Sequence, residues 1–361
     1  MHILYVYADT PQEWNCSEWR CAVPVRAIRR TGRHSADMLS ITDFADETRE
    51  AQDKCGCADL IIVQRNLIGP VLAAIQHWQA REKTVIADFD DAYDLMPPTN
   101  PGHRYWVQGI GQEAGGLPQK IDPPPLTQFK WGLKLVHAAT VPSQRLADDW
   151  RPYTQMYYLP NFIELEPYTS VSRETHEGVV IGWGGSLSHM QSFAESGVLA
   201  ALKRVCRQRP QVRVLIAGDR RVFDLLPLPV EQKLFHPWVA YADWGKVLAK
   251  MDIGLAPLYG PYDERRSWIK VLEYMLMRMP WVASEGPAYQ PMRSHGWLVK
   301  NTTSAWERML LELVDHLEEY RLEAAQDAYL FGLGQSIDEN VDKVIGIYSE
   351  ILAGARKSSG R

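Results

Sequence analysis

Short hydrophobic runs alternate with amphipathic segments through the first part of the chain. Five apolar runs of four to six residues predict strands, at 2–7, 60–64, 84–88, 138–142 and 156–159. The segments 22–31 and 70–81 have the spacing of helices, and the first of them ends at Gly32. Strands that alternate with helices indicate a parallel sheet that is covered on both faces.

A second alternating series follows a polar stretch at 161–177. Its predicted strands are 179–183, 212–217, 233–236, 253–258 and 281–283. Its predicted helices are 191–208, 242–250, 303–325 and a terminal helix that begins at 338. The series has about the same length as the first, so the chain divides naturally into two similar halves.

Two such halves predict an α/β protein with two Rossmann-like domains that face each other across a cleft. We expect domains over 1–163 and 164–337, with a terminal helix at 338–354 that packs back on the first domain. The segment 96–125 is rich in Pro, Gly and Gln, which predicts an irregular loop, either a flap over the cleft or a binding loop.

The composition narrows the choice of partners. The net charge of −5 gives no reason to expect nucleic acid or an anionic membrane as a bulk partner. The five cysteines lack the spacing of a zinc site and predict reduced thiols. The opening MHILYVYAD is too short for a signal peptide or a membrane span. We therefore expect a cytoplasmic protein, with attachment to a membrane surface and the oligomeric state left open.

The segment 251–284 holds the most informative chemistry in the chain. An apolar run, a polar loop, an amphipathic helix with Ser267 at its N-cap and a second apolar run follow one another. At about 100° per residue, Arg266, Lys270 and Glu273 fall on one narrow wedge of the helix. Two cations and a carboxylate beside a helix N-terminus suit a ligand with an anionic phosphate and a hydroxyl-rich sugar or ribose.

Several passages together carry a family resemblance. They are IGWGGSLSHMQSF (181–193), VLIAGD (214–219), FHPWVAYADWGKVLAKMDIGLAPL (235–258), SWIKVLEYMLMRMPWVAS (267–284) and, in the first half, SEWRCAVPVRAI, ADFDDAYDL and TVPSQRLADDW. In order and spacing they resemble GT-B fold glycosyltransferases of the retaining, nucleotide-sugar-dependent type (family 4-like, group 1).

The resemblance implies a glycosyltransferase that moves a sugar from a nucleotide diphosphate donor, such as a UDP- or GDP-sugar, to an acceptor hydroxyl. It implies retention, no metal and no other cofactor, and a role in glycan or envelope polysaccharide synthesis. The first domain then holds the acceptor and the second holds the donor.

Three strand ends of the second half carry the expected donor contacts: Gly184, Gly185, Ser186 and His189 after the first, Gly218 after the second, and Trp238 and Val239 after the third. Glycines let backbone amides approach a diphosphate, and Ser and His add donors. The resemblance assigns the last pair to the nucleotide base. The structural alternatives for these positions are plain turn glycines and a core tryptophan.

The helix after Ser267 supplies the remaining donor contacts. Arg265, Arg266 and Lys270 are candidates to hold the diphosphate, because preorganised cations stabilise the charge that builds on the leaving oxygens. A solvated basic loop is the structural alternative. Glu273 resembles the carboxylate that holds the donor ribose in this family.

One departure from the family pattern concerns the donor sugar. The family has a second glutamate eight positions before Glu273, where this chain has Arg265. Ser267 and the pair Asp263–Glu264 are therefore expected to replace it, and Glu264 joins Lys270 among the candidate catalytic residues.

The acceptor is expected at the first domain. The run Asp88-Phe89-Asp90-Asp91 follows a predicted strand and resembles acidic runs that face the cleft in related first domains. Asp91, or else Asp90, is expected to orient or deprotonate the acceptor hydroxyl, and a helix N-cap with solvated acids is the alternative. Trp19 and Arg20 follow the first strand, where Arg20 is a candidate to bind an anionic acceptor.

Other functions remain open at this stage. The acceptor is a glycan or a lipid-linked sugar or, given a basic cluster at 26–34, a hydroxylated base of phage DNA. A nucleotide-sugar epimerase or hydrolase, or an inactive sugar-binding module, could also occupy the same fold.

Overall fold

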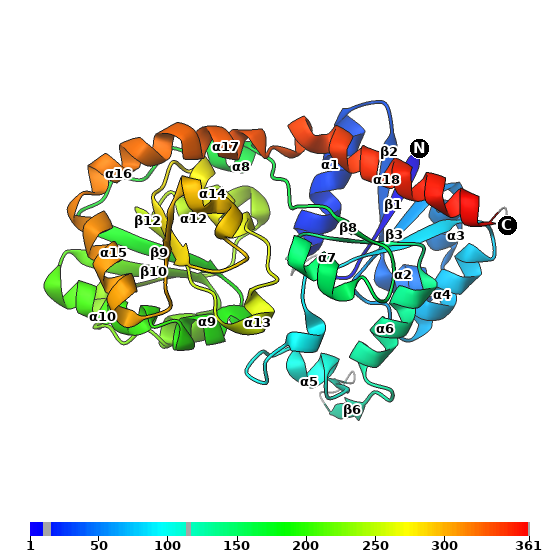
Figure 1. The fold of residues 1–361 in the computed structure, drawn as a ribbon, viewed down its shortest axis with the longest axis horizontal. Coiled ribbons are helices and arrows are strands. Elements are labelled where there is room, and N and C mark those ends of the chain that lie inside the picture. The colour runs from blue at the N-terminus through cyan, green and yellow to red at the C-terminus, as the bar shows by residue number, and fades with distance from the viewer. Residues whose placement is uncertain (10–15, 113–116, 360–361) are drawn as a thin grey trace. The chain divides into compact units, whose positions relative to one another are not determined.

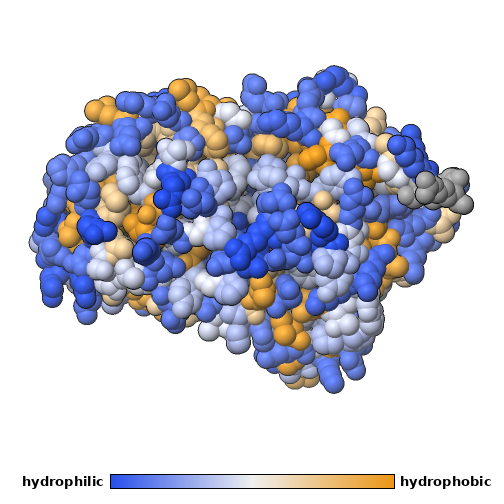
Figure 2. Space-filling model, in the orientation of Figure 1, coloured by the Kyte–Doolittle hydropathy of each residue, from blue (hydrophilic) through white to orange (hydrophobic). Residues whose placement is uncertain are grey.

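The computed structural model describes residues 1–9, 16–112 and 117–359, and it divides into two compact units (Figure 1). Unit 1 comprises Met1–Asp94, His103–Glu164 and Ser336–Arg361, and unit 2 comprises Leu95–Gly102 and Leu165–Gln335. On the face seen in Figure 2, polar side chains cover most of the surface, with small hydrophobic patches between them. Among the described residues, no helix is both long enough and apolar enough to cross a membrane.

Unit 1 is built on a parallel sheet of six strands in the order β2-β1-β3-β4-β7-β8. The strands are β1 (His2–Tyr7), β2 (Ser35–Ser40), β3 (Leu60–Gln64), β4 (Thr84–Asp88), β7 (Ala139–Val141) and β8 (Met156–Tyr158). The central strands β3 and β4 are buried along their whole length, which explains their continuous hydrophobic sequences.

The helices of unit 1 include both predicted and unpredicted elements. They are α1 (Val23–Arg30), α2 (Ile41–Ala45), α3 (Arg49–Cys57), α4 (Pro70–Gln79), α5 (His103–Trp106), α6 (Pro125–Leu135), α7 (Gln144–Trp150) and α18 (Ile337–Ser359). The sequence did not predict β2, α2 or α3. SADMLS lies at the edge of the sheet and mixes polar and apolar residues, so its pattern is weak.

The segment 96–125 is more regular than predicted. It contains the short helix α5 and an antiparallel pair, β5 (Ile110–Gln112) with β6 (Pro118–Lys120). Tyr93 stacks on Trp106 of α5 with ring centroids 4.0 Å apart, and Phe129 of α6 meets the same two rings edge-on. This aromatic packing orders the segment. It joins residues that are distant in the sequence, so local composition does not reveal it.

Unit 2 is also built on a parallel sheet of six strands, in the order β11-β10-β9-β12-β13-β14. The strands are β9 (Val179–Gly185), β10 (Val212–Gly218), β11 (Lys233–His236), β12 (Ile253–Ala256), β13 (Trp281–Ser284) and β14 (Trp297–Val299). In chain order this is 3-2-1-4-5-6, the order of the dinucleotide-binding Rossmann fold, whereas unit 1 follows the related order 2-1-3-4-5-6.

The helices of unit 2 are α8 (Glu166–Thr169), α9 (Met190–Glu195), α10 (Val198–Gln208), α11 (Arg220–Asp224), α12 (Trp244–Leu248), α13 (Gly260–Asp263), α14 (Ile269–Leu276), α15 (Thr303–Asp315), α16 (Leu317–Glu323) and α17 (Tyr329–Gly334). The predicted single helix 191–208 is broken at Gly197, which has φ +85°. A Cβ there would lie 2.8 Å from the Thr303 nitrogen, so a close approach of α15 requires glycine at the break.

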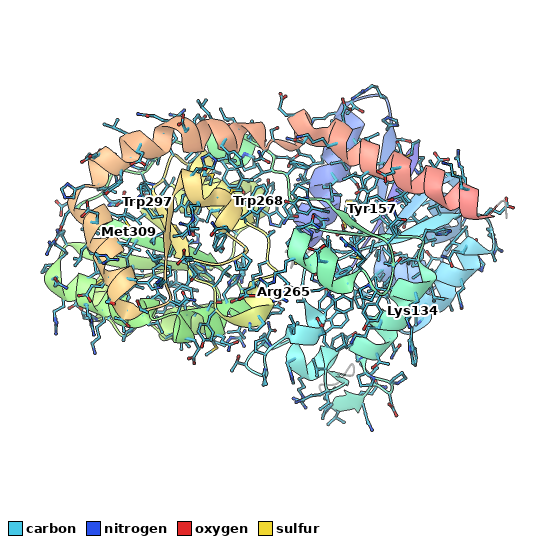
Figure 3. All side chains as sticks on the ribbon, in the orientation of Figure 1. Lys134, Tyr157, Arg265, Trp268, Trp297 and Met309 are labelled. Carbon is cyan, nitrogen blue, oxygen red and sulfur yellow. The ribbon has the colours of Figure 1, made fainter. Side chains whose placement is uncertain are left out.

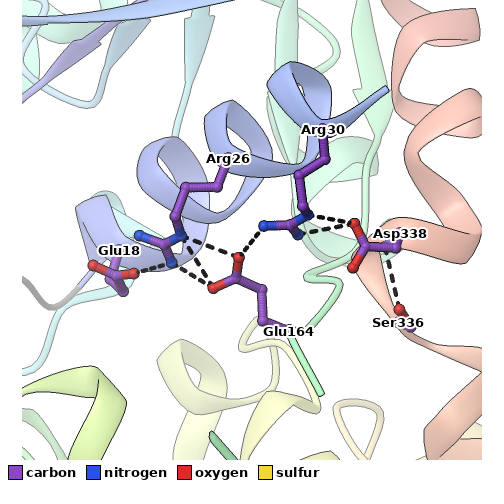
Figure 4. A network of polar contacts seen from close by, with 6 residues as sticks. All are labelled: Glu18, Arg26, Arg30, Glu164, Ser336 and Asp338. Carbon is purple, nitrogen blue, oxygen red and sulfur yellow. Dashed lines mark hydrogen bonds and ion pairs between the residues drawn. The ribbon is translucent and has the colours of Figure 1, made fainter. Parts of the chain in front are cut away.

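An ion-pair network joins α18 to α1 inside unit 1 (Figure 4). Arg26 pairs with Glu18 and Glu164, and Arg30 pairs with Glu164 and Asp338. Arg29 of α1 pairs with Asp37, and Arg33, which follows α1, pairs with Asp342 of α18. The arginines of the basic cluster at 26–34 are therefore matched by carboxylates of the chain itself. This removes the feature that favoured phage DNA as an acceptor.

Candidate functional site

The sheet topology of unit 2 marks one place for a ligand. From β9 the chain continues to β10 on one side, while β12 lies against β9 on the other. Parallel α/β sheets bind ligands outside the carboxyl ends of strands at such a reversal, because the two connecting segments diverge there. The segments in question are the end of β9 with residues 186–189, and residues 257–270 after β12; they contain most of the donor residues predicted from the sequence.

Lys270 and Arg266 both reach the segment after β9. The Lys270 ammonium donates to the Gly184 carbonyl and lies 5.0 Å from the centroid of the Trp183 ring. The Arg266 Nη2 donates to the Ser188 hydroxyl at 3.0 Å, and Ser188 Oγ is 2.8 Å from Ser186 Oγ. Two cations from the α13–α14 region therefore converge on one loop.

Asp263 fixes the Arg266 guanidinium. Its Oδ1 accepts from Arg266 Nε at 2.7 Å, and its Oδ2 accepts from the Tyr259 amide at 2.9 Å and from the Ser192 hydroxyl. Asp263 is almost fully buried. This corrects the expectation that Asp263 contacts the donor sugar, because its oxygens already hold protein groups.

Glu273 is a buried carboxylate next to Lys270. Its Oε1 accepts from the Trp244 indole at 2.9 Å and from the Tyr168 hydroxyl at 3.2 Å. Burial raises the pKa of Glu273 to about 7, although Lys270 and the two hydrogen bonds act the other way. Burial lowers the pKa of Lys270 to about 8; Glu273 opposes that shift and Arg266 adds to it. Both groups are thus pushed toward their neutral forms until a ligand supplies charge.

His189 lies at the end of the same loop with an unused ring nitrogen. The residue is 8% exposed, and its Nδ1 has no hydrogen-bond partner within the described parts of the chain. Burial lowers the pKa of His189 well below its usual range, and the charges of Arg266 and Lys270 lower it further. His189 is therefore a neutral imidazole that faces two cations, a suitable neighbour for a bound anion.

The glycines of this loop are required by packing. A Cβ on Gly184 would lie 2.1 Å from the Trp244 ring, and one on Gly185 would lie 2.6 Å from the Trp183 ring. Gly218 at the end of β10 has φ +104°, and its Cβ would lie 2.5 Å from the Gly185 carbonyl. The sequence explained these glycines by approach to a diphosphate, and the structure adds close contact with aromatic rings as a sufficient cause.

Trp238 is a surface residue. It is 53% exposed, which excludes the alternative of a core tryptophan. A Cβ on Gly218 would lie 3.1 Å from its ring, so the indole lies against the end of β10. Val239 follows it and is half-buried. An exposed indole beside the strand ends offers a flat surface for a nucleotide base.

Ser267, Glu264 and Arg265 differ from the sequence-based expectations. Helix α14 begins at Ile269 with Trp268 as its N-cap and no side-chain cap, so Ser267 is not the capping residue (Figure 3 labels Arg265 and Trp268 at this turn). Arg265 Nη1 donates to the Pro261 carbonyl and pairs with Glu264, 3.2 Å away.

Glu264 lines a cavity of about 60 Å³ at the ends of β12 and β13. Ser284 and Asn301 form its polar floor, since Ser284 donates to Asn301 at 2.7 Å and accepts from the Leu258 amide at 2.9 Å. None of the ten residues that line this cavity is one of the cations assigned to the diphosphate. Glu264, which the sequence had grouped with Lys270, thus lines a cavity that Lys270 does not line.

Arg20 does not have the role expected for it. It is 4% exposed, and its guanidinium forms a two-point ion pair with Asp88 at 2.6 and 2.9 Å. It also donates to the Leu159 carbonyl and to Asn161, both at 2.8 Å. Arg20 therefore holds strand ends of unit 1 together and is not placed to bind an anionic acceptor. Its neighbour Trp19 is half-buried.

Asp90 and Asp91 lie half-buried beyond β4. Burial raises the pKa of Asp90 to about 6, with Asp91 adding to the shift and Cys16, Arg65 and Arg20 opposing it. A carboxyl group with this pKa can accept a proton near neutral pH, which a base for a hydroxyl must do. Asp90 therefore stays a candidate for the acceptor hydroxyl beside Asp91, which the sequence preferred.

Sequence reasoning missed Tyr168 and Trp244, which hold Glu273, and Asp263 as the group that orients Arg266. No local pattern marks the first two, because they come from α8 and α12 and meet Glu273 only in the folded chain. Asp263 lies three residues before Arg266, and this i,i+3 spacing of opposite charges was a usable signal.

Comparisons with known proteins agree with this fold. Residues 178–316 match the family described as glycosyl transferases group 1. HepE of Anabaena, in complex with UDP and glucose, is 13% identical, with 97% of this chain and 99% of that chain covered and a TM-score of 0.64. Sucrose-phosphate synthase of Thermosynechococcus elongatus is 13% identical, with 98% and 99% covered and a TM-score of 0.64.

A third structure belongs to a different enzyme class. UDP-GlcNAc 2-epimerase of Neisseria meningitidis, bound to UDP-GlcNAc, is 10% identical, with 96% and 99% covered and a TM-score of 0.54. No curated protein matches the sequence. At these identities the structural matches concern the fold, and the family match concerns residues 178–316. The chain has the GT-B fold, and its residues 178–316 form a group 1 glycosyltransferase domain.

Proposed function

We propose that the chain transfers a sugar from a nucleotide diphosphate donor to an acceptor hydroxyl, with the donor bound at the strand ends of unit 2. One observation carries this proposal. Lys270 and Arg266 converge on the loop after β9, where a buried His189 nitrogen has no partner among the described residues. This nitrogen and the two cations lie where the order of the strands reverses, and such a place suits a diphosphate.

The electrostatics of Lys270 suit a leaving group whose charge grows during the reaction. Burial lowers the pKa of the Lys270 ammonium to about 8, and a bound diphosphate would raise it again. An ammonium held by the Gly184 carbonyl needs little reorganisation as the glycosidic bond breaks. The cation then stabilises the nucleoside diphosphate as it departs.

The neighbouring groups suit the other parts of the donor. Trp238 offers an exposed ring to the base, and Glu273 offers a carboxylate to the ribose hydroxyls. HepE binds UDP and glucose on the same fold, which supports a uridine nucleotide as the first donor to test. We assign Asp90, and next to it Asp91, to the acceptor hydroxyl.

We also propose that transfer retains the anomeric configuration and needs no metal ion. In this scheme the leaving group departs first, an oxocarbenium-like centre forms, and the departing phosphate takes the proton of the acceptor hydroxyl. The acceptor oxygen then attacks the sugar from the face that the phosphate has left. The family resemblance supports this route, in which Lys270 and Arg266 provide the charge stabilisation that a metal would otherwise supply.

The test begins with binding and continues with product analysis. UDP, GDP and their glucose and N-acetylglucosamine conjugates are screened by thermal shift, since a ligand of the native state raises its melting temperature. The donor found is then incubated with and without saccharide acceptors, and the products are identified by NMR. Acceptor-dependent release of the nucleotide with an α-linked product from an α-linked donor supports the proposal. Release or epimerisation at full rate without an acceptor, or no nucleotide binding at all, contradicts it.

A further inference from the structure

The sheet of unit 1 has its own topological reversal. From β1 the chain continues to β2 on one side, while β3 lies against β1 on the other. Asp9 follows β1 and Arg65 follows β3, so both lie at the carboxyl edge where such sheets bind ligands. Arg65 has φ +42°, an uncommon conformation for a residue with a side chain, and such strain concentrates at functional positions.

Hydrogen bonds build this edge into a fixed arrangement. Arg65 pairs with Asp9, whose Oδ2 accepts from the Ser17 amide at 2.8 Å. The Ser17 hydroxyl donates to Gln64 Oε1 at 2.6 Å, and the Ala8 amide donates to the same oxygen at 2.9 Å. Two donors on Oε1 fix the orientation of the Gln64 amide and direct its NH₂ group elsewhere.

Two buried polar groups at this edge are unsatisfied. Gln64 is 1% exposed and Tyr93 is 2% exposed, and neither Gln64 Nε2 nor the Tyr93 hydroxyl has a partner in the part of the chain that the structure describes. The Tyr93 ring is held by its stacking on Trp106. A buried polar group without a partner costs folding free energy, so a native protein that keeps two at one edge calls for an explanation.

The charges nearest the Tyr93 hydroxyl come from the same edge. Burial is the main cause that raises its pKa; Asp90 and Asp91 add to this, and Arg65 opposes it. With the Arg20–Asp88 pair included, four carboxyl groups, those of Asp9, Asp88, Asp90 and Asp91, stand against the two guanidinium groups of Arg20 and Arg65 among the described residues of the cluster. An excess of carboxylates repels phosphates and uronic acids, whereas hydroxyl groups can both donate to carboxylates and accept from Tyr, Gln and Arg.

We propose that this edge of unit 1 binds a neutral, hydroxyl-rich saccharide as the acceptor, with Tyr93, Gln64 and Arg65 donating to its hydroxyl oxygens and Asp90 and Asp91 accepting from its hydroxyl groups. The inference rests on the proposed transfer reaction for its biological meaning. Its novelty lies in the charge class of the acceptor and in Tyr93 as a binding residue. Anionic acceptors, including DNA and phosphorylated glycans, are the alternatives that the charges oppose.

Tyr93→Phe is the decisive variant, because it removes a hydroxyl that has no hydrogen-bond partner among the described residues. Its melting temperature should equal or exceed that of the wild type, since no intramolecular hydrogen bond is lost. Its affinity for a neutral saccharide should nevertheless fall about three- to tenfold, the loss expected for one hydrogen bond. If Tyr93 had a purely structural role, saccharide affinity would not fall while the melting temperature was kept. Tyr153→Phe is the matched control, because Tyr153 packs on Trp150 of the same aromatic cluster.

Binding to the full-length chain is measured by calorimetry and ligand-observed NMR with maltose and lactose as neutral probes. Glucuronic acid, glucose 6-phosphate and a short DNA duplex serve as anionic probes. We expect the wild type and Tyr153→Phe to prefer the neutral probes and Tyr93→Phe to bind them more weakly. Tighter binding of an anionic probe, unchanged affinity in Tyr93→Phe, or no neutral binding by the wild type would overturn the proposal.

UDP binding is measured on the same samples. It reports on unit 2, so a failure of the donor assignment shows there and can be told apart from a failure of the acceptor assignment.

Discussion

Replacement of Lys270 by methionine tests the charge that the donor site depends on. The substitution keeps the length of the aliphatic stem but removes the ammonium that donates to the Gly184 carbonyl. A hydrogen bond from a charged group contributes about 1.5–3 kcal/mol, so affinity for UDP should fall about 10- to 100-fold. If the cation acts more strongly on the leaving group than on the bound donor, kcat should fall by a further 10²–10³-fold.

The same substitution has a separate, pH-dependent effect on stability. Glu273 already has a raised pKa through burial, and the loss of Lys270 removes the countercharge that opposes this shift. A raised acid pKa means that the native state binds the proton more tightly, so the native state is penalised once pH exceeds that pKa. Lys270→Met should therefore cost little stability at pH 6 and on the order of 1–2 kcal/mol at pH 8.

Calorimetry and steady-state kinetics check both effects. UDP binding at pH 8 should take up protons in the wild type, because the bound diphosphate raises the lowered pKa of Lys270, and buffers of different ionisation enthalpy reveal this uptake. The uptake should be lost in Lys270→Met. Lys246→Met is the control, since Lys246 is an exposed residue of α12 that pairs with Asp243. The reasoning is refuted if Lys270→Met keeps UDP affinity and kcat/KM within about twofold of the control, a ratio worth less than 1 kcal/mol.

Three further substitutions test the structural assignments by chemical denaturation. Gly184→Ala places a methyl group 2.1 Å from the Trp244 ring and should cost about 1–3 kcal/mol, so an unchanged midpoint would contradict the packing described. Arg20→Met leaves the buried Asp88 without its countercharge and should cost about 3–5 kcal/mol, whereas a residue that served only an acceptor would leave stability unchanged. Because the pKa of Asp90 is raised, the free energy of unfolding of the wild type relative to that of Asp90→Asn should increase as pH falls from about 6 to 4. The increase should be on the order of 1 kcal/mol after allowance for partial exposure. If the difference between the two proteins does not change with pH, the pKa of Asp90 is not raised.

Hydrophobic pattern predicted the regular part of the fold because parallel strands are buried on both faces. LIIVQ and TVIAD therefore appear as continuous apolar runs, and they form β3 and β4. The edge strand β2 lacks this signal, α2 has only five residues, and α3 is short and mostly exposed. The break at Gly197 depends on contact with α15, a hundred residues farther along the chain, so the periodicity of 191–208 could not reveal it.

The candidate site shows the same division. Helical spacing placed Arg266, Lys270 and Glu273 together, and the structure does bring Lys270 and Arg266 to one loop. Their partners lie elsewhere: Glu273 meets side chains of α8 and α12, and Arg20 meets Asp88 across 68 positions of sequence. Such contacts decide whether a charged side chain is paired with another group of the protein or is directed toward a ligand.

By itself the sequence determined the α/β class, most of the strands and the grouping of cations after β12, because strand burial and helical periodicity are local properties of the chain. Tertiary structure alone decided the order of the strands and the burial of Arg20 and Asp263. It also decided that Gln64 Nε2 and the Tyr93 hydroxyl have no hydrogen-bond partner among the described residues. These features depend on which distant segments become neighbours, and a residue has the same letter in the sequence whether its charge is neutralised inside the fold or left for a ligand.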